Sequence, residues 1–63
     1  MNPNLNVYTA ATVLIEQYGA DAAVRATTYA DDFLEKGNAT MAGVWQAFVG
    51  GVDELQRRRR PNN

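Results

Sequence analysis

The sequence contains no cysteine, no histidine and no serine among its 63 residues. Without cysteine there is no disulfide and no thiolate metal site, and without histidine the commonest general base and metal ligand is missing. Glycine-rich phosphate loops and converging carboxylate pairs are also lacking. We therefore expect no enzyme activity, no cofactor and no metal site.

Long apolar runs are absent as well. No stretch approaches the roughly 20 residues of a membrane span, and the first six residues lack the cationic start of a signal peptide. We expect a cytoplasmic protein that makes no membrane contact. A chain of this length forms one domain and buries only about 60% of the surface of its unfolded state. With no disulfide or zinc site to stabilise it, either tight helix packing or self-association must do so.

The region 38–56 carries the clearest pattern. Apolar residues recur there at the i, i+3, i+4, i+7 spacing that gathers side chains on one face of an α-helix. A strand would place Trp45 and Phe48 on opposite faces, so the helical interpretation is favoured. We expect the core to form along this stripe, with Trp45 at its centre. The stripe consists of Met41, Val44, Trp45, Phe48, Val49, Val52 and Leu55.

Two further helices precede this one. Val7, Ala10, Ala11, Leu14, Ile15 and Tyr18 line the first, and Ala20, Ala23, Val24, Ala26, Thr27, Ala30, Phe33 and Leu34 line the second. We expect Gly19 and Gly37 to end these helices, Asn4 or Asn6 to cap the first, and Asn38 to cap the third. Because the connections are short, the predicted fold is all-α, a small antiparallel three-helix bundle. Its helices cover about 5–18, 20–36 and 39–58, with a disordered arm at 1–4 and a basic tail at 57–63.

Charged residues on the second helix suggest local contacts. Asp21 with Arg25, and Asp32 with Lys36, are spaced i, i+4 and are expected to pair on the outer face. Asp31 and Asp32 point about 100° apart on a helix, so they do not converge on a metal. We expect a structural role for Asp31, as a cap or as the acceptor of a hydrogen bond from a tyrosine.

The glycine pair at 50–51 interrupts the third helix with two residues that each cost up to about 1 kcal/mol relative to alanine. One interpretation is a single helix that is locally soft or kinked. The other is a close approach by a second helix backbone. Small residues at positions 43, 47 and 50 form a strip opposite Trp45, and the ring of Tyr29 projects away from the main stripe. The candidate interaction residues are therefore Tyr29, Gly43, Ala47 and Gly50.

Four of the six basic residues are consecutive: Arg57, Arg58, Arg59 and Arg60. They are candidate contacts for phosphate, on nucleic acid or on acidic lipid. The run stands alone, however, with no interleaved aromatic residue and no second basic patch. A solvated tail that complements the negative end of the last helix is the favoured interpretation.

The arrangement resembles a family of small, uncharacterised, all-helical bacterial proteins. The first helix of that family ends in a bulky residue and glycine, the second is alanine-rich, and the third carries tryptophan. The matching residues are Ala11, Leu14, Ile15, Gly19, Asp21, Ala22, Ala30, Asp31, Leu34, Gly37, Gly43, Trp45, Asp53, Glu54 and Leu55. In that family a histidine often stands at the position of Tyr18 and an aspartate at that of Asn38. The resemblance implies a helical fold and a bacterial cytoplasmic setting, with no known activity.

We expect a non-enzymatic protein-interaction module that binds another protein or a second copy of itself as a homodimer. A small inhibitor of a larger enzyme is a variant of this function. The competing hypothesis is a nucleic-acid-associated accessory protein that uses the arginines at 57–60.

Overall fold

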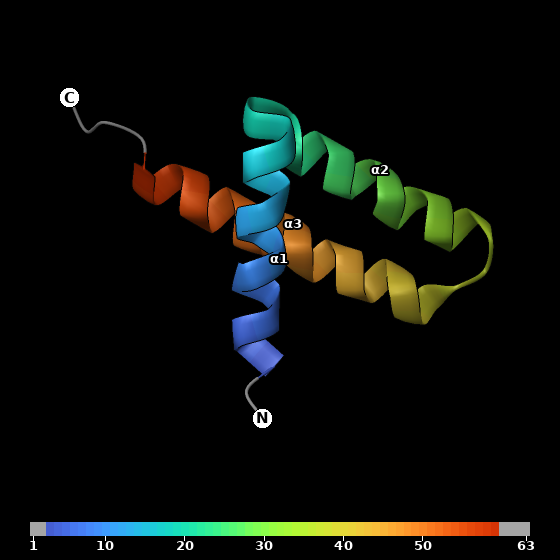
Figure 1. The fold of residues 1–63 in the computed structure, drawn as a ribbon. Coiled ribbons are helices and arrows are strands. Elements are labelled where there is room, and N and C mark those ends of the chain that lie inside the picture. Colours follow the sequence, from blue (N-terminus) through green and yellow to red (C-terminus); the bar gives the residue numbers. More distant parts are fainter. Residues whose placement is uncertain (1–2, 60–63) are drawn as a thin grey trace.

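The computed structural model describes the backbone of residues 3–59 and the side chains of residues 7–58. The described chain is helical apart from one short turn and contains no strand, which confirms the predicted all-α class. Its elements are α1 (Pro3–Tyr18), the 3-10 turn η1 (Gly19–Asp21), α2 (Ala22–Glu35) and α3 (Ala39–Arg59) (Figure 1).

The start of α1 differs from the prediction. The helix begins at Pro3, so part of the expected arm at 1–4 is helical, and Asn4 and Asn6 lie inside the helix rather than at its cap. Proline suits the first helical position because its missing N–H would have no partner there. Residues 1–2 and 60–63, which complete the predicted arm and tail, lie outside the described residues.

The corner between α1 and α2 is formed at Gly19. Its φ of 57° lies in the left-handed region that glycine adopts at least cost, so α1 ends there as predicted. The chain then passes through η1 directly into α2. Gln56 of α3 donates a hydrogen bond from Nε2 to the Gly19 carbonyl oxygen at 2.9 Å. This contact, which the sequence pattern did not predict, ties the corner to α3.

The turn between α2 and α3 satisfies the backbone groups of both helix ends. Gly37 has a φ of 79°; its N–H bonds to the Leu34 carbonyl oxygen at 3.0 Å, and that of Asn38 to the Phe33 carbonyl oxygen at 2.8 Å. This pair of bonds is the Schellman motif. The Asn38 side chain then accepts a hydrogen bond from the Met41 N–H at 3.1 Å. The predicted roles of Gly37 and Asn38 are thus confirmed.

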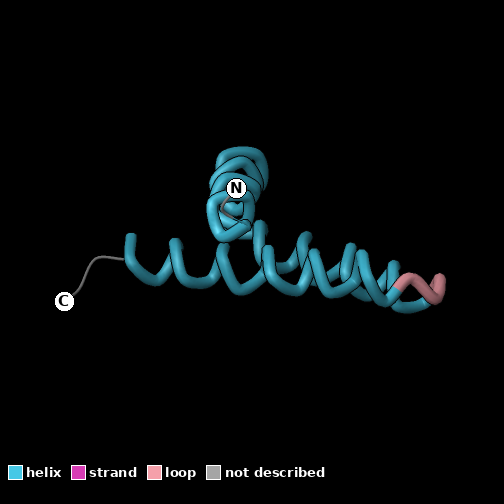
Figure 2. Tube along the Cα trace, turned by 90° about the horizontal axis from the view of Figure 1, so that it is seen from below, coloured by secondary structure: helices cyan, strands magenta, loops and turns pink. Residues whose placement is uncertain are grey.

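The three helices are not all antiparallel to one another. Helices α2 and α3 form an antiparallel hairpin, and α1 crosses one face of that hairpin steeply (Figure 1). Figure 2, which looks along α1, shows it standing on one side of the hairpin. The smallest extent of the molecule is 18 Å, about two helix layers. The predicted antiparallel three-helix bundle is therefore replaced by a two-layered arrangement.

The core is built mainly from small side chains. Its buried apolar residues are Ala11, Leu14, Ala22, Ala26, Ala30, Ala42 and Val52. Val52 is the one fully buried side chain larger than alanine within the described part of the chain. Trp45 is only half-buried, so its predicted place at the centre of the core is wrong. The apolar stripe predicted for α2 is also displaced, because Val24 and Leu34 are exposed.

Gly51 lies where α1 crosses α3. A Cβ built there would come within 3.0 Å of Val7 Cγ1 and 3.3 Å of Ala11 Cβ, whereas one built at Gly50 would meet no atom within 4 Å. The helix continues through both glycines as far as Arg59. The close approach is therefore made at Gly51 by α1 of the same chain, and not at Gly43 or Gly50 of the strip where close packing was expected. None of the described helices is both long and apolar enough to cross a membrane.

Candidate functional site

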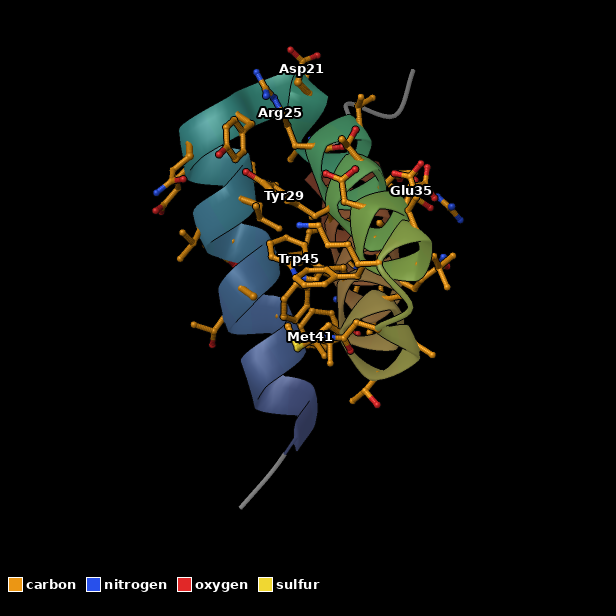
Figure 3. The ribbon with its side chains drawn as sticks, turned by 90° about the vertical axis from the view of Figure 1, so that its right-hand side faces the viewer. Asp21, Arg25, Tyr29, Glu35, Met41 and Trp45 are labelled. Carbon is orange, nitrogen blue, oxygen red and sulfur yellow. The ribbon has the colours of Figure 1, made fainter. Side chains whose placement is uncertain are left out.

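A cluster of large apolar side chains lies on the side of the hairpin that α1 crosses, beyond α1 toward the α2–α3 turn. We call it the open aromatic face: Tyr29, Met41, Val44, Trp45 and Phe48. Figure 3 shows Tyr29, Trp45 and Met41 in the angle between α1 and the hairpin. Helical spacing places the four α3 members together, because residues three, four and seven apart share a face.

Aromatic contacts join the two helices across this face. The rings of Tyr29 and Trp45 lie 4.7 Å apart with a tilt of 36° between their planes. Trp45 and Phe48 make an edge-to-face contact at 5.1 Å and 75°. Both geometries fall in the range that aromatic pairs prefer. The structure therefore corrects the expectation that Tyr29 projects away from the apolar stripe, because Tyr29 packs on the tryptophan of that stripe.

The face is open because α1 covers only part of the hairpin. Val44 lies seven residues before Gly51, so it shares the face of α3 that meets α1 but lies two helical turns away. No helix packs over it there (Figures 1 and 2), and it is 38% exposed. Tyr29 is 39% exposed, and Met41, Trp45 and Phe48 are half-buried. Figures 1 and 2 agree that no other helix stands on this side of the hairpin.

Arg25 of α2 lies beside the end of α1, where α1 bounds the open aromatic face. Its guanidinium carbon lies 5.1 Å from the centre of the Tyr18 ring, which is a cation–π contact between α2 and the end of α1. The predicted ion pairs of Asp21 with Arg25 and of Asp32 with Lys36 are not formed among the described side chains. Stacking on Tyr18 takes the place of the first pair.

A tyrosine–carboxylate hydrogen bond does exist, but between residues other than those predicted. Tyr8 of α1 donates its hydroxyl hydrogen to Glu54 Oε1 of α3 at 2.7 Å, and Glu54 Oε2 accepts from Arg58 at 2.7 Å. The hydrogen bond to Glu54, followed by the charge of that carboxylate, raises the pKa of Tyr8 above its ordinary 10.0. Asp31, the expected acceptor, is exposed. The bond links α1 to α3 on the side of the crossing away from the open aromatic face.

The strip of small residues lies elsewhere on the molecule. Gly43, Ala47 and Gly50 are exposed, and a Cβ added at either glycine would meet no atom within 4 Å. They lie on the side of α3 away from Trp45, as predicted. The structure separates Tyr29 from this strip and joins it to Trp45. The four candidate interaction residues thus belong to two different surfaces.

The arginines at the end of α3 have acidic partners. Arg57 pairs with Asp53 and Arg58 pairs with Glu54, each one helical turn away. These side chains are largely exposed, so each pair contributes little stability. A phosphate group would have to displace a carboxylate at both positions. Arg59 is helical, while its side chain and the whole of Arg60 lie outside the described residues.

Metal chemistry has no candidate site in the described chain, where no group of three or more acidic side chains could hold an ion. The described carboxylates also include none that is buried.

Sequence reasoning identified Tyr29 and Trp45 separately but missed their contact. The available signal was the pairing of helix positions across a tight turn, which brings α2 residues before Gly37 beside α3 residues after it.

Comparisons with protein-family models, with curated proteins and with solved structures found no match to this chain.

Proposed function

We propose that this protein is a non-enzymatic helical binding module that holds another protein chain against its open aromatic face. The observation that carries the proposal is the stack of Tyr29, Trp45 and Phe48, which remains partly exposed although the core below it is mostly alanine. A monomer seldom gathers its largest apolar side chains on one face that stays partly exposed.

Aromatic side chains also suit this role energetically. Tryptophan and tyrosine dominate the binding energy of many protein interfaces because they bury a large area at a small entropy cost. The mutual stacking of Tyr29, Trp45 and Phe48 restricts their rotamers before a partner arrives, which lowers the cost of binding. An inhibitor of a larger enzyme would use the same surface. We propose that this protein acts in the cytoplasm.

The nucleic-acid alternative has weaker support. Arg57 and Arg58 are neutralised by carboxylates of their own helix, and the described body of the protein is acidic around α2. Non-specific affinity for phosphate grows with the number of unpaired basic side chains.

The test compares three forms of the protein as bait in a lysate of the source organism: the parent, Val44→Glu and Val24→Glu. Both variants place a glutamate at an exposed valine of a helix, so their charge and helix propensity are matched. Val24 lies on the outer side of α2. We expect a bound protein that the parent and Val24→Glu retain and that Val44→Glu loses. Equal retention by all three baits contradicts the proposal.

A further inference from the structure

The uncovered part of the hairpin has room for one helix. Twelve residue steps separate Ala39 from Gly51, which is about 18 Å of helix. Helix α1 crosses α3 at Gly51. Because a helix is about 10 Å wide, half of its width covers about 5 Å of this length on the side toward Ala39. The remaining length of about 13 Å matches a single further helix lying beside α1.

The protein itself shows what kind of helix packs on this surface. The residues that α1 lays on the hairpin belong to the same apolar cluster as Trp45 and Phe48, so the open aromatic face continues an interface that α1 already forms. A second α1 is available only from a second copy of the chain.

We propose that the open aromatic face is the contact between two copies of this protein, each laying its α1 across the uncovered half of the other's hairpin. The inference rests on the proposed function and names its partner. The arrangement is two-fold symmetric, so a single interface covers both open faces. The pair of α1 helices then lies side by side between two hairpins, and the dimer has three layers.

The outer side of α1 is suited to burial in such a dimer. The helix carries one charged residue, Glu16, in its 16 positions. Its other exposed residues are uncharged: Tyr8, Thr9, Thr12, Gln17 and Val13, which is 44% exposed. Helices that face water on one side normally carry several charges there. A second hairpin packed on this side would explain their scarcity.

The single charge on this side has an opposite charge to meet. Symmetry about an axis parallel to α1 places the last turns of each α1 over the partner's α2. Glu16 lies in that part of α1. Lys36, the C-cap of α2, follows Tyr29 by seven residues, so helical spacing places it on the same side of the hairpin as Tyr29. Neither side chain takes part in an ion pair among those that the structure describes. Glu16 of one copy therefore pairs with Lys36 of the other.

The first test is sedimentation equilibrium from about 1 µM to about 500 µM, a range that reports micromolar dissociation constants. We expect the parent to dimerise. Val13→Glu and Val44→Glu each place an unpaired charge in the proposed contact and should raise the dissociation constant at least about 30-fold. Val24→Glu should leave it within about twofold, because Val24 lies outside the contact. Circular dichroism verifies that each variant remains helical.

The second test does not depend on destabilising the dimer. Because the chain has no cysteine, Glu16→Cys and Lys36→Cys each provide one unique thiol. Mixing the two proteins with a short bismaleimide should give a mixed cross-linked dimer, and mixing Glu16→Cys with Val24→Cys should give far less. Equal yields from both mixtures overturn the proposed arrangement.

Other outcomes also decide the question. If the protein is a monomer at every concentration, a second copy is not the partner and the inference is wrong. The proposed function is then decided by the bait comparison alone. A dimer that Gly50→Glu dissociates and Val44→Glu does not would place the contact on the small-residue strip and overturn the inference.

Discussion

Gly51 of α3 lies so close to Val7 of α1 that a methyl group on Gly51 would come within 3.0 Å of Val7 Cγ1. The neighbouring Ala11 Cβ would be 3.3 Å away. A side chain at this position would therefore need Val7 and α1 to move by a few tenths of an ångström. Glycine fits the close crossing at this point, and the adjacent Gly50, which faces open space, provides a matched control.

Gly51→Ala should destabilise the protein, and Gly50→Ala should stabilise it. Alanine gains up to about 1 kcal/mol over glycine in a helix interior, and Gly50→Ala keeps this gain because no atom obstructs the new methyl. At Gly51 the contact with Ala11 Cβ can be relieved only by moving the helices apart, and such overpacking costs about 1–3 kcal/mol. Urea unfolding followed by circular dichroism measures both changes.

A double-variant cycle tests the cause. Val7→Ala removes the closest atom, so it should cost less stability in the Gly51→Ala background than in the parent. If Gly51→Ala proved as stabilising as Gly50→Ala, the two helices would not be in close contact at this residue.

The sequence predicted part of the buried stripes of α1 and α3 correctly. The stripe of α1 around Ala11 and Leu14 and that of α3 around Val52 lie where the spacing placed them. The capping residues Gly19, Gly37 and Asn38 were also correct, because their roles depend on local backbone chemistry.

The face of α2 could not be found in the same way. Periodicity gives weight to large residues, and Val24 and Leu34 drew the predicted stripe toward themselves. The close packing of the helices instead selected the alanines at 22, 26 and 30, spaced one turn apart, and left both large residues exposed. Size favours burial in general, but a short distance between helix axes favours small side chains at the contact.

The crossing of α1 and the open aromatic face depend on contacts between helices. A short connection at Gly19 permits both an antiparallel and a crossed arrangement. In the crossed arrangement Gly51 lies against Val7, which is 44 residues away in the sequence. Tyr29 was identified as an interaction residue, but its stacking partner lies on another helix. Local patterns predict which residues share a helix face and leave open which faces meet.

Tyr8 should titrate at higher pH than an ordinary tyrosine. Its hydrogen bond to Glu54 favours the protonated hydroxyl and raises its pKa. A group whose pKa is raised on folding adds stability that is fully present below its unfolded pKa, near 10.0, and is lost as the pH rises through the raised value. Ultraviolet difference titration of the three tyrosines, with Tyr8→Phe to assign the signal, measures this.

Glu54→Gln supplies the control for that titration. It removes the negative charge and weakens the acceptor, so the pKa of Tyr8 should fall toward its ordinary value. An unaltered titration in this variant would show that the hydrogen bond between α1 and α3 is absent in solution.

Removing the residues after Gln56 should have little effect on the affinity for nucleic acid at physiological salt. Arg57 and Arg58 already have carboxylate partners, so the full chain should bind duplex DNA only at low ionic strength. Fluorescence anisotropy with a labelled duplex at several salt concentrations measures this. Tight binding near 0.15 M salt that disappears on truncation would instead favour a nucleic-acid role.

Val52→Ala should destabilise the fold more per deleted atom than Trp45→Ala does. Val52 is fully buried, and losing two methyl groups there costs about 2 kcal/mol with its cavity. Trp45 is half-buried, so its truncation should fall below the range of about 3–5 kcal/mol found for buried aromatic residues. A cycle of Tyr29→Ala and Trp45→Ala should give a coupling of about 0.5–1.5 kcal/mol from their stacked rings. These free energies come from urea unfolding at one low protein concentration, so that dimerisation does not contribute. If the coupling were zero, the two rings would not be stacked in solution, and the open aromatic face would lack its aromatic contact between α2 and α3.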